Sequence, residues 1–154
     1  MKKQQLQETI DFLKSNGITN PEIGIVLGTG LGKLVDEIEI EKEIAYSEIP
    51  NFPQATVEFH SGKIIYGELS GKKVIVMSGR FHVYEGYSLW EVTYGIRTMH
   101  GLGVSTLLIS NAAGAINLSY KKGDLMLLED HLNLQSGSPL AFKGANDFGN
   151  IFAD

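Results

Sequence analysis

The sequence predicts an α/β fold in which a central mixed sheet is flanked by helices. Short apolar runs typical of buried strands alternate with segments whose apolar residues recur at helical spacing. Loops of small residues follow several of these runs, as in α/β proteins that bind a ligand at the carboxyl edge of the sheet. A chain of 154 residues fits a single domain, in which roughly 70% of the unfolded surface is buried.

Each element is predicted by its own local pattern. Apolar residues recur at helical spacing in residues 3–16, and Ser88 with Glu91 forms a capping box at the start of a second helix. Residues 37–62 contain two prolines and no clear period, which predicts a long irregular loop. The expected strands are 23–27, a hairpin of 63–69 and 72–78, a buried strand at 105–110, and a strand that begins near Asp124.

The composition excludes several classes of function. The net charge is −5 and the basic residues are scattered, whereas nucleic-acid binding requires a clustered basic face. The chain has no cysteine and no paired-histidine spacing typical of a metal site. No apolar run approaches the roughly 20 residues that span a bilayer, and residues 1–10 lack the apolar core of a signal peptide. We therefore expect a cytoplasmic protein with no metal, nucleic-acid or membrane partner.

The stretch IVLGTGLGKL, residues 25–34, leads from an apolar strand into closely spaced glycines, which suits a backbone that approaches a phosphate. The spacing is not that of a dinucleotide fingerprint, because Lys33 stands where the third glycine is required. It is not a Walker loop either, since Leu34 replaces the Ser or Thr. Thr29 adds a hydroxyl beside backbone N–H groups, so the loop suits free phosphate, and a plain tight turn is the alternative.

A second polar cluster, SGRFHVYEGY, follows the predicted strand at 72–78. In an extended chain Arg80, His82 and Tyr84 project to the same side. Arg80 can grip two phosphate oxygens, His82 can donate a further hydrogen bond, and Tyr84 offers a wall with a polar tip. Glu85 is close enough in sequence to orient His82 and to stabilise its charge. A surface turn with an Arg–Glu pair is the alternative interpretation.

A third loop, NAAGAIN, follows the predicted strand at 105–110. Its small side chains allow the backbone N–H groups of Ala112 and Ala113 to approach a ligand, and close helix packing is the alternative. Three strand-end loops that each suit an anion favour one shared anion site.

With these motifs, the chain resembles the purine nucleoside phosphorylases of the trimeric, low-molecular-mass type. The matching stretches, in the family's order, are GIVLGTGLG, EIPNFPQATVEFHSG, GRFHVYEGYSLWEVT, LLISNAAGAIN and GDLMLLEDHLNL. The resemblance runs from about Pro21 to the C-terminus. It implies one phosphorylase/hydrolase-like nucleoside phosphorylase domain over residues 1–154, C-terminally truncated because the family is considerably longer.

The resemblance implies phosphorolysis of purine ribonucleosides or deoxyribonucleosides. Inorganic phosphate attacks the anomeric carbon and releases the free base and (deoxy)ribose 1-phosphate. Phosphate is thus a co-substrate, no metal or organic cofactor is needed, and the complete protein is a homotrimer. The implied roles are catalysis by His82 and Glu85, phosphate binding by Thr29, His60, Arg80, His82 and the backbone of Ala112, and nucleoside binding by Tyr84 and by Phe152 from a neighbouring subunit.

The sequence departs from the family at two points. Phe59, beside His60, stands where family members usually carry a glycine. The base-recognising Glu and Asn of the family lie beyond Asp154, so the chain is expected to carry the phosphate half of the site and to have little or no activity alone. The choice between inosine, guanosine and adenosine is therefore left open.

Two other interpretations are kept. A methylthioadenosine phosphorylase performs related chemistry, but its variant of NAAG with Thr and Cys does not occur here. A non-catalytic phosphate- or nucleoside-binding fragment that assembles with partners belongs to a different class.

Thr29→Ala tests the glycine loop. In a chain of full family length, we expect KM for phosphate to rise much more than KM for inosine, because the lost hydroxyl serves phosphate alone. Steady-state kinetics measure both constants, and an unchanged KM for phosphate would mean that the loop is a plain turn.

Overall fold

The computed structural model describes residues 2–28, 30–54 and 62–148. The chain divides into two compact units, Met1–Asn111 and Ala112–Asp154. Within the described residues, no helix is long and apolar enough to cross a membrane.

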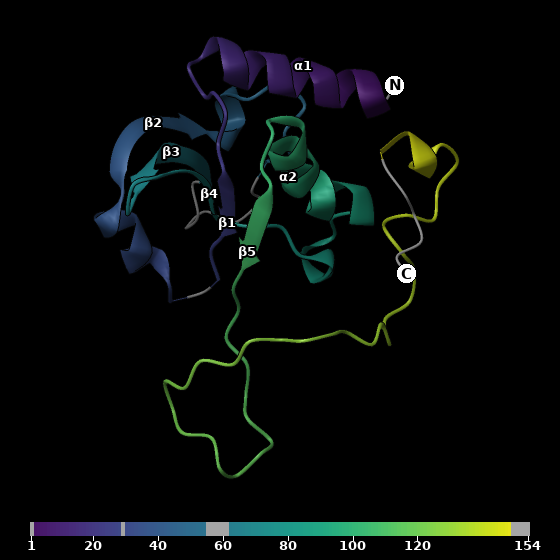
Figure 1. Cartoon of the computed structure of the whole chain (residues 1–154). Coiled ribbons are helices and arrows are strands. Elements are labelled where there is room, and N and C mark those ends of the chain that lie inside the picture. Colours follow the sequence, from purple (N-terminus) through teal and green to yellow (C-terminus); the bar gives the residue numbers. More distant parts are fainter. Residues whose placement is uncertain (1, 29, 55–61, 149–154) are drawn as a thin grey trace. The chain divides into compact units, whose positions relative to one another are not determined.

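A five-stranded mixed sheet forms the centre of the first unit (Figure 1). Its strands are β1 (Ile23–Val26), β2 (Glu39–Ala45), β3 (Lys63–Leu69), β4 (Lys72–Ser78) and β5 (Thr106–Ile109). In the order β2-β3-β4-β1-β5, β1 pairs in parallel with β4 and with β5, whereas β2, β3 and β4 pair antiparallel. The predicted mixed sheet and its hairpin are therefore confirmed.

Two α-helices of the described residues, α1 (Lys2–Ser15) and α2 (Leu89–Gly101), pack on each other beside the sheet (Figure 1). The predicted capping box starts α2. Ser88 Oγ accepts a hydrogen bond from the backbone N–H of Glu91 at 3.3 Å, and the Glu91 carboxylate accepts one from the N–H of Ser88 at 2.8 Å. These two bonds satisfy N–H groups that a helix start otherwise leaves unpaired.

Branched apolar side chains form the core of the first unit, and one glycine allows a helix to pack closely on the sheet. A Cβ on Gly95 would lie 2.3 Å from Sδ of Met77, so the glycine lets α2 approach β4 closely. The core side chains of the sheet that are 5% exposed or less include Ile25, Ile64, Ile65, Val74, Ile75 and Val76. Packing of these apolar strands against the helices fixes where the strand ends lie.

The prediction of an irregular loop over 37–62 is wrong for residues 39–45, which form β2. Only Ile44 in this strand is buried, so the segment lacks the regular apolar alternation that reveals a half-buried strand in a sequence. β2 is instead held by its backbone ladder with β3, across a register shift between Ile40 and Lys42.

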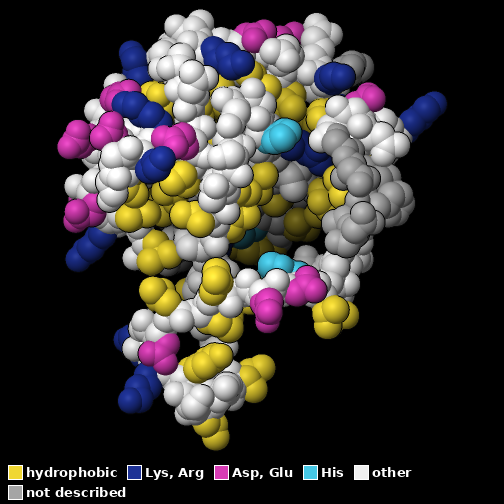
Figure 2. All heavy atoms as spheres, in the orientation of Figure 1, with side chains coloured by type: hydrophobic (Ala, Val, Ile, Leu, Met, Phe, Trp, Pro, Cys, Tyr) yellow, Lys and Arg dark blue, Asp and Glu magenta, His cyan; other side chains and the backbone are white. Residues whose placement is uncertain are grey.

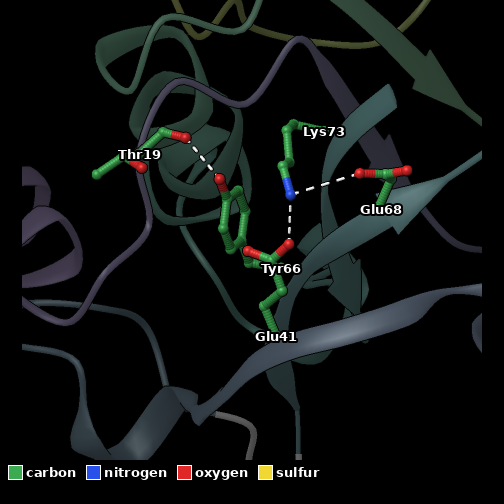
Figure 3. A network of polar contacts seen from close by, with 5 residues as sticks. All are labelled: Thr19, Glu41, Tyr66, Glu68 and Lys73. Carbon is green, nitrogen blue, oxygen red and sulfur yellow. Dashed lines mark hydrogen bonds and ion pairs between the residues drawn. The ribbon is translucent and has the colours of Figure 1, made fainter. Parts of the chain in front are cut away.

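Charged side chains also tie β2 to the sheet (Figure 3). Lys73 of β4 contacts the carboxylates of Glu41 on β2 and of Glu68 on β3, the second at 3.6 Å. The hydrogen bond that Lys73 donates to Glu41 raises the pKa of Lys73. Beside this group, Tyr66 donates a hydrogen bond of 2.6 Å to the carbonyl oxygen of Thr19. Charges of both signs cover this part of the surface (Figure 2), which discourages pairing of the edge strand with another chain.

β5 lies at the opposite edge of the sheet. The predicted strand is confirmed there, but its predicted burial is wrong, because Leu108 and Ile109 are 53% and 56% exposed. An apolar strand in a parallel ladder is ordinarily covered on both faces. Among the described residues, β5 has one strand partner, β1, and its side chains consequently stay open to solvent.

The second unit is described by itself over residues 112–148, where η4 (Ala145–Phe148) is the only regular element. The predicted strand from Asp124 is wrong for this structure. Leu125 and Leu127 are 98% and 96% exposed, so the apolar run finds neither a ladder nor a core. Apolar side chains of this unit lie at the surface (Figure 2). An apolar run predicts a strand only where a neighbouring strand is available to pair with it.

Thr9→Val tests the contact of α1 with its neighbours. The buried hydroxyl donates to the carbonyl oxygen of Pro50 at 2.6 Å and lies 2.7 Å from the hydroxyl of Tyr94. We expect the isosteric change to lower the free energy of unfolding by about 1–3 kcal/mol, because buried polar groups lose a partner. Urea denaturation measures this change in the free energy of unfolding.

Ser15→Ala on the same helix is the matched control. Its exposed hydroxyl bonds only the carbonyl of Phe12, so a change within about 0.5 kcal/mol is expected. Equal effects of the two substitutions would contradict the assignment of stability to the Thr9 contacts.

Candidate functional site

Three loops of the first unit meet at one edge of the sheet. Gly28, Gly79 and Ser110 lie just beyond the carboxyl ends of β1, β4 and β5. Because these three strands are adjacent and parallel, their carboxyl ends lie at the same edge. This is the edge at which the sequence predicts a ligand site.

Ser110 joins the three loops through hydrogen bonds. Its hydroxyl accepts from the backbone N–H of Gly28 at 3.1 Å, and its carbonyl oxygen accepts from Nη1 of Arg80 at 3.0 Å. A Cβ on Gly28 would lie 2.5 Å from that carbonyl oxygen, so only glycine permits the approach. The sequence analysis missed Ser110, although a polar residue at the end of the apolar run STLLIS was a usable signal.

Arg80, His82 and Glu85 form a continuous chain of polar contacts. Nε of Arg80 donates to Nε2 of His82 at 2.9 Å, and Nδ1 of His82 contacts Oε1 of Glu85. Since the guanidinium can only donate, Nε2 is the acceptor and the ring hydrogen lies on Nδ1, directed at the Glu85 carboxylate. The side chains of His82 and Glu85 are 29% and 18% exposed. Glu85 thus orients His82, as its sequence position predicts.

Tyr84 does not project with its neighbours as an extended chain would. The backbone is extended at His82, with φ −124° and ψ 147°, but Val83–Glu85 form the 3₁₀ turn η3. The turn brings Glu85 back to His82 and stops the alternation before Tyr84. Tyr84 instead stacks on the ring of His82, with centroids 4.7 Å apart and planes at 17°, and stays 83% exposed. The expected wall is therefore an exposed ring beside the histidine.

These groups line a cavity of about 420 Å³ within the first unit. Its described lining includes Gly28, Tyr46, Arg80, His82 and Glu85. The hydroxyl of Tyr46 donates to the carbonyl oxygen of Gly79 at 2.6 Å, and burial raises the pKa of this phenol. Tyr46 therefore remains a neutral donor that braces the loop after β4. Nothing in the sequence around residue 46 marks it for this position.

Three of the predicted site residues are not among those that the structure describes, and a fourth belongs to the second unit. Thr29, His60 and Phe152 lie outside the described residues. Ala112 is the exposed first residue of the second unit and is described with that unit alone. Their assigned roles stay predictions.

A model of the phosphorylase superfamily matches residues 22–154. The chain belongs to this superfamily. Within it, purine nucleoside phosphorylase 1 of Geobacillus stearothermophilus is 50% identical over 154 residues, which are 100% of this chain and 56% of the relative. Purine nucleoside phosphorylase of Rattus norvegicus is 43% identical over 147 residues, covering 94% of this chain and 50% of the relative.

Solved members of the superfamily share the fold. The crystal structure of Schistosoma mansoni purine nucleoside phosphorylase in complex with BCX-34 has a TM-score of 0.88 to this chain at 42% identity. The match covers 98% of this chain and 56% of that chain. The phosphorylase-superfamily chain described here thus spans about half the length of the curated relatives it matches.

Gly28→Ala tests the close approach of the loops after β1 and β5. The added Cβ would lie 2.5 Å and 2.9 Å from two backbone atoms, the oxygen of Ser110 and Cα of Asn111. Because backbone must move, we expect the free energy of unfolding to fall by about 1–3 kcal/mol. Thermal and urea denaturation measure the loss.

Gly32→Ala in the same loop is the control. A Cβ there would meet no atom of the described residues within 4 Å, so we expect a change within about 0.5 kcal/mol. Equal stability of the two variants would contradict the close approach at Gly28.

Proposed function

We propose that this chain supplies the phosphate-binding part of a purine nucleoside phosphorylase. The observation that carries the proposal is the Arg80–His82–Glu85 chain, held by Ser110 in a cavity at the carboxyl edge of three parallel strands. The similarity to two purine nucleoside phosphorylases supports the choice of reaction.

The cavity suits inorganic phosphate on chemical grounds. A guanidinium carries five N–H donors in a planar fork that matches phosphate oxygens. Two donors of Arg80 bond Ser110 and His82, which fixes the plane of the fork. The His82 ring, which the Glu85 carboxylate orients, lies beside this fork.

In the proposed reaction a phosphate oxygen forms a bond to the anomeric carbon while the bond from that carbon to the purine nitrogen breaks. The bonding electrons leave with the purine, which gains one proton in place of the one that phosphate loses, and the products are the free base and (deoxy)ribose 1-phosphate. Positive charge develops on the sugar in the transition state. A phosphate held rigidly beneath the ring both attacks and stabilises this charge.

The remaining assignments complete the proposal. Residues 1–154 belong to one nucleoside phosphorylase domain, which acts in the cytoplasm with phosphate as co-substrate and without a further cofactor. Thr29, His60 and Ala112 add phosphate contacts, and Tyr84 lies beside the ribose. The complete protein is a homotrimer in which Phe152 reaches the nucleoside pocket of a neighbouring subunit.

A chimera tests the proposal directly. Residues 1–154 replace the matching part of the Geobacillus stearothermophilus relative, and release of hypoxanthine from inosine is measured with phosphate as the varied substrate. We expect phosphate-dependent activity. In this chimera Arg80→Lys keeps the charge but loses the fork, so KM for phosphate is expected to rise about 10- to 100-fold, the equivalent of one hydrogen bond to a charged group.

Arg97→Lys is the matched control, because Arg97 lies over the ring of Trp90 on α2, outside the cavity lining. A folded chimera without phosphate-dependent activity, or equal effects of the two arginine substitutions, would overturn the proposed function.

A further inference from the structure

The hydrogen of the His82 ring is on the wrong nitrogen for phosphate. Nε2 of His82 accepts a hydrogen bond from Nε of Arg80 and therefore carries no hydrogen. The ring hydrogen lies on Nδ1, which contacts the Glu85 carboxylate. The ring thus presents an acceptor toward Arg80, whereas the unprotonated oxygens of phosphate are acceptors themselves.

A change of tautomer does not solve this conflict. If the hydrogen moved from Nδ1 to Nε2, the bare Nδ1 would face a carboxylate, and two acceptors would be in contact without a hydrogen between them. An unpaired contact of this kind in a half-buried position is costly. His82 can donate to phosphate through Nε2 and keep its bond to Glu85 only when both ring nitrogens carry hydrogen.

We propose that phosphate binding in this cavity is coupled to the uptake of one proton from solvent by the His82–Glu85 pair. The inference rests on the proposed phosphate site and adds its regulation by pH. Phosphate enters as the dianion, the bond between Arg80 Nε and His82 Nε2 breaks, and both released groups turn their donors to the anion. The proton comes from solvent and forms an N–H bond at Nε2 of His82, and no covalent bond between two heavy atoms changes.

The other titratable groups that line the described part of the cavity do not compete for this proton. The guanidinium of Arg80 has donors only and offers no acceptor for a proton. Tyr46 is a neutral phenol, because burial raises its pKa, and it donates to Gly79. Tyr84 stacks on the His82 ring from its own exposed position. The pair of His82 and Glu85 is therefore where the proton is held.

Titration calorimetry of this chain with inorganic phosphate measures the coupling. Repeating the titration in buffers of different ionisation enthalpy, at a pH where free phosphate is a dianion, gives the number of protons taken up. We expect about one proton per phosphate, and a dissociation constant that rises about tenfold per pH unit above neutrality.

Glu85→Gln separates this coupling from binding. The amide of the new side chain can donate to Nδ1, so His82 can carry its hydrogen on Nε2 without an added proton. We expect the proton uptake to fall to about zero, with an affinity that no longer depends on pH in this range. Glu22→Gln is the matched control, because that carboxylate pairs with Lys72 at the surface, outside the cavity lining, and its variant should retain the uptake.

Binding of phosphate by the unchanged protein without proton uptake would overturn the coupling and leave the proposed function standing. Absence of phosphate binding at every pH would overturn both. Nitrogen NMR of the His82 ring provides an independent readout, with hydrogen expected on Nδ1 alone before phosphate and on both nitrogens after it. A ring that stays neutral in the complex would also refute the inference.

Discussion

The parallel pairing of β1 with both β4 and β5 is the constraint on which the site depends. Parallel neighbours bring their carboxyl ends to one edge, so three loops distant in sequence become adjacent. Gly28, Arg80 and Ser110 can exchange hydrogen bonds only in this arrangement. The antiparallel strands β2 and β3 continue the sheet beyond β4. Ion pairs of Lys73 on β4 with Glu41 and Glu68 help to hold these strands in the sheet.

The elements that could be predicted from the sequence are those whose signals are local. A capping box, an apolar run and the two-residue connection Ser70-Gly71 each involve a few consecutive residues, and α2, β3 and β4 lie where they were expected. β2 was missed because its stability comes from a ladder and from ion pairs with residues far along the chain, such as Lys73 with Glu41. The prediction of a strand from Asp124 was wrong because an apolar run forms a strand only where a partner strand is available to pair with it.

The candidate site divides in the same way. Arg80, His82 and Glu85 lie within one stretch of six residues, which was enough to predict that Glu85 orients His82. The hydrogen bond from Arg80 to His82 was not predicted. Ser110 and Tyr46 contribute through tertiary hydrogen bonds. A polar residue at the end of an apolar run is a local signal for Ser110, whereas no local pattern marks Tyr46. The expectation of an extended chain through Tyr84 was wrong because Val83–Glu85 form a 3₁₀ turn. With three residues per turn, this turn brings Glu85 back to His82.

The polar groups of the cavity bond one another. Half-buried donors and acceptors are costly when unpaired, so these internal partners stabilise the site. Gly28 and Arg80 find theirs in Ser110, and His82 finds its own in Arg80 and Glu85. Binding is then an exchange of hydrogen bonds whose net free energy is smaller than the new contacts alone would give. A ligand gains from this exchange only if it replaces every bond that it breaks, and an oxyanion with several acceptor oxygens does so better than a single carbonyl or hydroxyl group. The internal bonding of these groups therefore favours the proposed oxyanion over a ligand with a single acceptor.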